Sequence, residues 1–156
     1  MHRHSAPSQL TSDPARQAPD LFRGCRFQIW RSVEAWIGLE DHEALALEGA
    51  EDFDRLASGG ATANQVKDLS RNLTLRSTEV LEAIGNFWDV REKNPKVQLR
   101  FRLLTTARAG VEKGAPFGHK VPGLNAWGKA AKSGTGIQPI RAFLLNEGKL
   151  AAPVKE

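Results

Sequence analysis

The stretch EGAEDFDRLASGGATANQVK, which runs from residue 48 to residue 67, decides the fold predicted for this chain. Gly59 and Gly60 lie between two short runs, residues 53–56 and 63–66, and a Gly-Gly pair is a preferred two-residue turn between antiparallel strands. The stretch therefore predicts a β-hairpin whose turn is centred on the two glycines.

With that turn, the hairpin pairs residues whose numbers add up to 119, so Asp52 faces Lys67 and Asp54 faces Gln65. Side chains alternate between the two faces of a strand, and directly opposed residues share a face. All four polar side chains are therefore predicted to project from one side of the hairpin. A slip of the register by one residue would separate the two acids from the glutamine and the lysine.

Carboxylates beside an amide oxygen are hard oxygen ligands that suit Mg²⁺ or Mn²⁺. A neighbouring ammonium group suits an anionic nucleophile or a phosphoryl oxygen. The four residues therefore indicate metal-assisted hydrolysis of a phosphodiester bond. The alternative is a solvated hairpin face that carries an ion pair and no chemistry.

The order of these residues resembles the PD-(D/E)XK nuclease superfamily. That family's core is an Asp followed by a hydrophobic residue, then a hairpin, then Glu or Gln, a hydrophobic residue and Lys. The matching residues in this chain are Asp52-Phe53 and Gln65-Val66-Lys67. Gln65 departs from the superfamily's commoner Glu, although Gln is frequent in one subgroup.

That subgroup is the double-stranded DNA endonuclease domain at the N-terminus of bacterial anti-phage effectors, of the CD-NTase-associated and STAND types. Three further features of residues 21–107 resemble it. Gly24, Phe27 and Gln28 form a Gly-x-x-Phe-Gln helix start, Glu48 precedes the Asp, and an amphipathic helix and a hydrophobic strand follow the Lys. The resemblance implies a Mg²⁺-dependent (or Mn²⁺-dependent) DNA endonuclease that degrades DNA in anti-phage defence. The alternative is an inactive nuclease-fold module that binds DNA or a protein partner.

The resemblance also implies roles for the site residues. Asp52, the Gln65 side chain and the backbone carbonyl of Val66 would ligate the metal ion. Lys67 would orient or activate the attacking water and balance charge in the transition state, so Asp52, Gln65 and Lys67 are the predicted catalytic residues.

Three accessory residues are open to two interpretations each. Asp54 either supports the metal ligands or binds a second metal ion, or it is part of a solvated face. Glu48 is a third carboxylate near the metal or a strand end in solvent, and Gln28 is a group near the catalytic face or a surface residue. Glu51 is predicted to point away from Asp52 because side chains alternate along a strand.

The charge of the chain favours a polyanionic partner. The formal net charge is +4, which makes nucleic acid the expected partner. Arg71 and Arg76 lie in a polar connection after the hairpin and are predicted to contact the phosphate backbone of double-stranded DNA. A homo-oligomer and a sensor domain outside this chain are further expected partners.

Hydrophobic periodicity predicts the remaining elements. Two helices are expected, at about residues 21–37 and 78–92, with strands at about 43–48 and 97–107 and two short helices at about 124–132 and 137–145. The single cysteine, Cys25, lies in the apolar stripe of the first helix and is expected to be buried. The stripe consists of Phe22, Cys25, Ile29, Val33, Trp36 and Ile37. The second helix has a stripe expected to face the core, formed by Val80, Leu81, Ile84, Phe87 and Trp88.

This order of elements predicts an α/β fold, a restriction-endonuclease-like αβββαβ core with a central mixed sheet flanked by helices. The expected organisation is a disordered lead-in at residues 1–19, a nuclease-like core at 20–109, and a basic Gly/Pro-rich loop with short helices at 110–156. The chain lacks a long apolar run and a cysteine framework, so a cytoplasmic protein without a membrane segment is expected.

Overall fold

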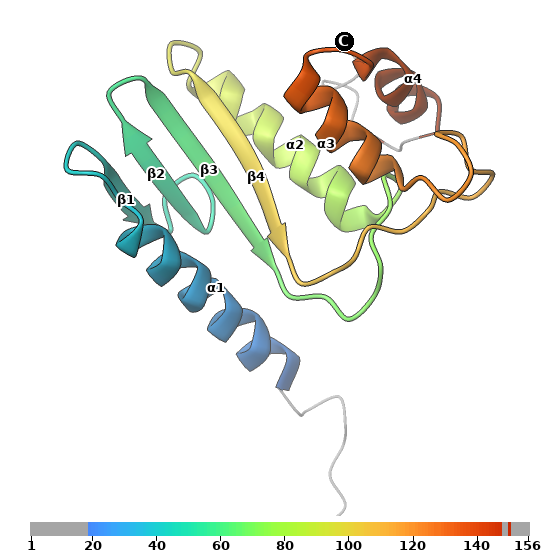
Figure 1. Ribbon diagram of the computed structural model, residues 1–156. Coiled ribbons are helices and arrows are strands. Elements are labelled where there is room, and N and C mark those ends of the chain that lie inside the picture. Colours follow the sequence, from blue (N-terminus) through green and yellow to red (C-terminus); the bar gives the residue numbers. More distant parts are fainter. Residues whose placement is uncertain (1–18, 148–149, 151–156) are drawn as a thin grey trace, which may run out of the picture.

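A computed structural model describes residues 19–147 and Leu150, and it shows a mixed α/β protein with one four-stranded sheet and four helices (Figure 1). The element order α, β, β, β, α, β over residues 19–105 agrees with the sequence. The predicted lead-in lies, apart from Pro19, outside the described residues. No helix within residues 19–147 is long and apolar enough to cross a membrane. The elements are α1 (Pro19–Ile37), β1 (Ala44–Leu47), β2 (Phe53–Ala57), β3 (Gly60–Lys67), α2 (Thr78–Lys93), β4 (Leu99–Thr105), α3 (Gly123–Ser133) and α4 (Ile137–Glu147).

The sheet has the strand order β1-β2-β3-β4. The first three strands form an antiparallel meander, and β4 lies parallel to β3. A parallel neighbour needs a crossover connection, and α2 supplies it. The antiparallel hairpin β2–β3 therefore lies in the middle of the sheet, with α2 connecting it to the last strand.

The hairpin turn lies one residue earlier than the sequence suggests. Ala57 pairs with Gly60, so Ser58 and Gly59 form the turn and opposed residues have numbers adding up to 117. Gly60 has a different role: its φ is 147°, and a Cβ there would collide with the backbone carbonyl of Gln98. The register is thus shifted by two residues, which leaves every side chain on its predicted face because the side-chain period is two.

Two faces of the sheet differ in chemistry. The carboxylate face carries Asp52, Asp54, Ala63, Gln65 and Lys67, which follow the alternation of β2 and β3. On this face α2 covers β4, with the rings of Phe87 and Phe101 at a centroid distance of 5.4 Å. The opposite face, here called the arginine face, carries Phe53, Arg55, Thr62, Asn64, Arg100 and Arg102.

Helix α1 lies on the arginine face, where Arg31, Glu34 and Ala35 border the same hollow as Asn64 and Leu104. Its side facing the sheet is polar or small: Ser32 is 9% exposed, and its hydroxyl donates to the Gln28 carbonyl at 3.0 Å. The apolar stripe points outward instead. The prediction that Cys25 is buried is wrong, because its side of the helix faces solvent.

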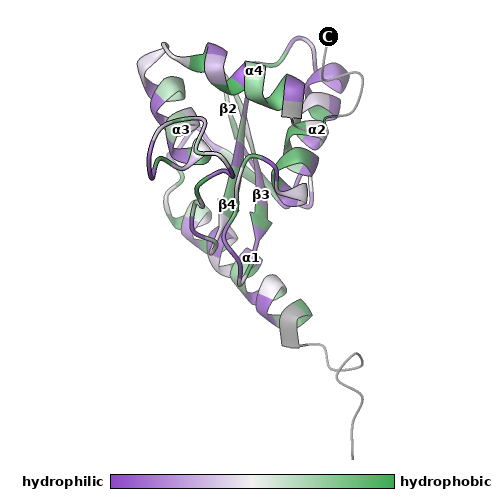
Figure 2. Ribbon diagram, turned by 90° about the vertical axis from the view of Figure 1, so that its right-hand side faces the viewer, coloured by the Kyte–Doolittle hydropathy of each residue, from purple (hydrophilic) through white to green (hydrophobic). Residues whose placement is uncertain are grey.

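The main hydrophobic core lies between α2 and the C-terminal helices α3 and α4, both of which the sequence predicts (Figure 2). Leu81 and Ile84 of α2 pack against this core, whereas Trp88 is only half-buried and lies under the guanidinium of Arg91. The predicted stripe of α2 is therefore partly correct. The buried members of the core are Leu75, Ala130, Ile140, Phe143, Leu144 and Leu150.

Candidate active site

Asp52 lies immediately before β2, beside the position of Gln65 in the hairpin register. Its Oδ2 accepts a hydrogen bond from the Val66 N–H at 2.5 Å. In a strand, the N–H and C=O of one residue point toward the same neighbour. The Val66 carbonyl is therefore directed to the same side as Asp52, and Gln65 lies opposite Asp52 in the continued register. Metal ligation by these groups stays a prediction.

Asp54 and Gln65 are the two most buried residues of the cluster, at 7% and 6% exposed. Asp54 Oδ2 accepts the Ala50 N–H at 2.6 Å. Asp54 Oδ1 and Gln65 Oε1 are buried and have no hydrogen-bond partner within the described part of the chain. Buried polar atoms normally have partners, so two acceptor oxygens on one face indicate a place for a group that attracts oxygen.

The loop between β1 and β2 closes tightly over Asp54. A Cβ at Gly49 would lie 2.3 Å from Asp54 Oδ2, so a side chain there would displace the Asp54 carboxylate. This close approach places the Ala50 N–H on the carboxylate. The short β1–β2 connection thus fixes the orientation of an acid that the sequence identified only by its position in a strand.

Glu51 joins the cluster, contrary to the prediction that it points away. It lies in the loop, where strand alternation does not apply. Burial, followed by the charges of Asp52 and Asp54, raises the pKa of the Glu51 carboxyl above its ordinary value, and Lys67 partly opposes this. Three charged groups therefore act on the Glu51 carboxyl. The sequence signal available for Glu51 was its position directly before Asp52.

Lys67 ends β3 and is half-buried on the carboxylate face. Its ammonium group makes no hydrogen bond or ion pair with the residues described in the structure, although its charge acts on Glu51. Among the four charges at this end of the hairpin, three are carboxylates and one is an ammonium, so negative charge is in excess.

Glu51→Gln is expected to stabilise the protein at neutral pH and to have little effect near pH 4. A raised pKa means that the folded state holds the Glu51 proton more tightly than the unfolded state, so stability falls as pH rises through the window above the ordinary value of 4.5. The neutral amide removes this loss. Thermal unfolding of both proteins at pH 4 and pH 7 measures it, and an equal shift at both pH values would contradict the assignment.

The accessory residues Gln28 and Glu48 contact each other. The Gln28 Nε2 donates to Glu48 Oε1 at 2.7 Å, and the Glu48 N–H donates to the Asp52 carbonyl at 3.1 Å. Glu48 has a φ of 51°, a strained value for a residue other than glycine. The pair connects α1 to the loop that carries the acids, and the Glu48 carboxylate is held by Gln28.

The two predicted DNA-binding arginines have partners within the protein. Arg71 forms an ion pair with Glu79 at 2.5 Å. The Arg76 guanidinium lies 4.8 Å from the centre of the Phe143 ring and donates to the Lys113 carbonyl at 3.5 Å. These contacts give both residues a structural role, and DNA binding by them stays a prediction.

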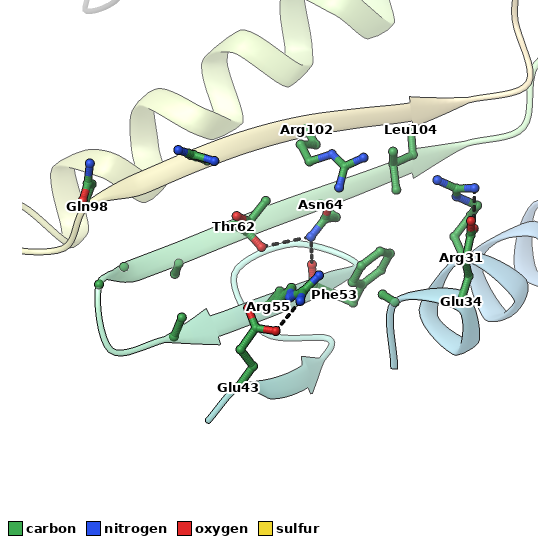
Figure 3. A pocket seen from close by; sticks show the side chains of 16 residues that line it. Arg31, Glu34, Glu43, Phe53, Arg55, Thr62, Asn64, Gln98, Arg102 and Leu104 are labelled. Atoms are coloured by element: carbon green, nitrogen blue, oxygen red, sulfur yellow. Dashed lines mark hydrogen bonds and ion pairs between the residues drawn. The ribbon is translucent and has the colours of Figure 1, made fainter. Parts of the chain in front are cut away.

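Sequence reasoning missed a second polar site, a hollow of about 610 Å³ on the arginine face (Figure 3). Arg31 pairs with Glu34, and Arg55 pairs with Glu43, whose pKa is lowered chiefly by that hydrogen bond. The signal in the sequence was the alternation of basic residues along β4. Two further lining residues, Arg100 and Arg102, form no ion pair with the described residues.

The described residues contain no group of three or more His, Cys, Asp or Glu side chains placed to hold a metal ion. The predicted ligand set instead combines carboxylates with an amide oxygen and a main-chain carbonyl.

Comparison of the chain with models of protein families, with curated proteins and with solved structures gave no match. The structure itself defines the class of this chain: it is a mixed α/β protein with a four-stranded mixed sheet and a polar cluster on its central hairpin.

Proposed function

We propose that this protein is a metal-dependent DNA endonuclease, with its active site on the carboxylate face. The observation that carries the proposal is the convergence of Asp52, Asp54, Gln65 and Lys67, with two buried oxygens that have no partner among the described residues. The restriction-endonuclease-like core, the degradative role in anti-phage defence and a sensor domain outside the chain rest on the sequence resemblance. The strand and helix order is compatible with them.

The residues of the cluster fit a hard divalent cation. The groups proposed as ligands offer oxygen donors, and Mg²⁺ and Mn²⁺ prefer carboxylate, carbonyl and water ligands. The negative charge that raises the pKa of Glu51 would be relieved by such a cation. Asp52, Gln65 and the Val66 carbonyl would hold it, and Asp54 and Glu51 would reinforce the field. The bound ion would supply Lewis acidity toward a phosphoryl oxygen.

The proposed reaction is hydrolysis of a phosphodiester bond in double-stranded DNA. A water oxygen forms a bond to phosphorus, the bond from phosphorus to a sugar oxygen breaks, and the water proton passes to solvent or to the leaving oxygen. Lys67 orients the water and stabilises the charge that develops on the phosphoryl oxygens, where a fixed cation acts most strongly.

A plasmid assay tests the proposal. Supercoiled DNA incubated with the protein and Mg²⁺ or Mn²⁺ is expected to become nicked or linear, and EDTA is expected to stop the reaction. Absence of cleavage by a folded protein with either metal, over a range of protein concentrations, would contradict the proposed activity.

Gln65→Glu is expected to increase metal affinity, because it places a carboxylate where the buried amide oxygen has no partner. Without metal the new charge at a 6% exposed position should lower the melting temperature. Added Mg²⁺ should then raise that temperature more than in the original protein. Thermal unfolding with and without Mg²⁺ measures this, and Gln138→Glu at an exposed position is the control. An unchanged response to Mg²⁺ would remove Gln65 from the ligand set.

A second candidate function is binding of DNA or a protein partner without cleavage. The hollow on the arginine face supports it, because Arg100 and Arg102 form no ion pair with the described residues. DNA affinity that is unaffected by EDTA, lost in an Arg100→Ser, Arg102→Ser variant, and unaccompanied by cleavage would favour this function over the first.

A further inference from the structure

Helix α1 turns its apolar side away from the protein. Phe22 is 74% exposed, Ile29 57%, Trp36 66% and Ile37 76%. The side that faces the sheet is formed by residues such as Gln28, Ser32 and Ala35. A surface helix normally buries its apolar stripe against the core, so α1 has the opposite arrangement.

The outward side is accessible. Both ribbon views show the N-terminal half of α1 extending beyond the end of the sheet (Figures 1 and 2). An exposed contiguous apolar surface of this kind usually marks an interaction site. The exposed side chains span about 24 Å of helix, from residue 21 to residue 37 at 1.5 Å per residue.

The apolar residues of α1 lie symmetrically about Ile29. Phe22 and Trp36 lie seven residues on either side of it, Leu21 and Ile37 lie eight residues away, and all four are exposed. Cys25 and the half-buried Val33 lie four residues on either side. The numbers in each pair add up to 58. Two identical antiparallel helices related by a two-fold axis at Ile29 would therefore match these apolar residues with one another, with the exposed Trp30 beside them opposite Gln28.

We infer that α1 is a self-association helix, and that two copies of this chain pair antiparallel through it with Ile29 on the two-fold axis. An interface related by two-fold symmetry must be self-complementary, and this stripe satisfies that requirement. Phe22 of one copy packs on Trp36 of the other, and Cys25 packs on Val33.

The charged residues of the neighbouring turn do not oppose this arrangement. Arg31 and Glu34 form an ion pair with each other and border the hollow on the arginine face. They therefore lie away from the apolar side and place no charge between two antiparallel copies. The inference is independent of the proposed cleavage.

Mass and fluorescence test the association. At about 100 µM the protein is expected to have twice the chain mass of 17.1 kDa by sedimentation equilibrium, and to dissociate on dilution. The emission of Trp30 and Trp36 should shift to longer wavelength as they return to water. A monomer at the highest concentration would overturn the inference.

Charge variants at Ile29 test the position of the axis. Ile29→Arg and Ile29→Glu each place two like charges face to face, so each variant should be a monomer with unchanged circular dichroism, because Ile29 is exposed in the protomer. An equimolar mixture should form a mixed dimer through opposite charges. Val97→Arg, at an exposed site outside the stripe, should stay a dimer. Dimeric Ile29 variants, or no mixed dimer, would overturn the inference.

Cysteine cross-linking tests the register. In the proposed pairing the two native Cys25 residues are about 12 Å apart along the helix axis, beyond the reach of a disulfide. Val33→Cys brings a new thiol opposite Cys25 of the other copy, so diamide should oxidise the pairs to a covalent dimer. The unsubstituted protein and the Cys25→Ser, Val33→Cys variant should stay uncrosslinked. Cross-linking of all three would indicate a parallel or random contact and overturn the register.

Discussion

Lys67→Ala is expected to lower the rate of metal-dependent plasmid cleavage by about 10²- to 10³-fold, the range seen when one preorganised electrostatic group is removed from an active site. The ammonium of Lys67 makes no hydrogen bond or ion pair with the described residues, so its removal should leave the fold intact. Its expected role is to act on charge that exists only during the reaction. The measurement is the initial rate of nicking at saturating Mg²⁺.

Two further variants serve as controls for the Lys67→Ala result. Lys96→Ala removes an exposed lysine far along the chain from the hairpin and should cleave at the original rate. Asp52→Asn keeps the size of the Asp52 side chain, which accepts a hydrogen bond from the Val66 N–H. This variant should be as inactive as Lys67→Ala. If purified Lys67→Ala keeps more than half of the activity, the catalytic assignment of the lysine is wrong.

Leu75→Ala is expected to have the largest effect on stability, a loss of about 2–5 kcal/mol in the free energy of unfolding. Leu75 is 0% exposed in the core between α2, α3 and α4, and its truncation leaves a cavity among side chains from several elements. Chemical denaturation followed by circular dichroism measures the change. Leu47→Ala, at a 62% exposed site, should stay within about 0.5 kcal/mol of the original protein.

The sequence and the structure give different burial for the Trp88 ring, and so different effects of its truncation on stability. Its place in the apolar stripe of α2 predicts a buried ring, and truncation of such a ring costs about 3–5 kcal/mol. In the structure Trp88 is half-buried, so Trp88→Ala should cost clearly less than Leu75→Ala. A larger loss for Trp88→Ala would mean that the ring belongs to the core.

The sequence predicted the elements and the carboxylate face because both depend on local periodicity. Asp52 and Gln65 share a face in either hairpin register, since the two registers differ by an even number of residues. The turn itself was placed wrongly, because Gly60 is required by the approach of Gln98, the residue before β4, a contact distant in sequence. Glu51 was missed because it lies in a loop, where no period applies.

The orientation of α1 could not be predicted for a different reason. An amphipathic pattern gives the spacing of an apolar stripe, and it does not identify what covers the stripe. In α1 the stripe faces outward, and the small residues Ser32 and Ala35 face the sheet. The core formed by α3 and α4 could not be predicted either, because it joins Leu75 to residues 117–150, which are distant from it in sequence.

The strand connections also set an order of assembly. A two-residue turn closes the β2–β3 hairpin, whereas β4 reaches β3 only after the chain has passed through residues 68–98 and α2. Closing a short loop costs less chain entropy than closing a long one, and parallel pairing is slow for that reason. We expect the hairpin to form before β4 docks. Asp52, Gln65 and Lys67 would then be in register while one edge of β3 is still open to other strands.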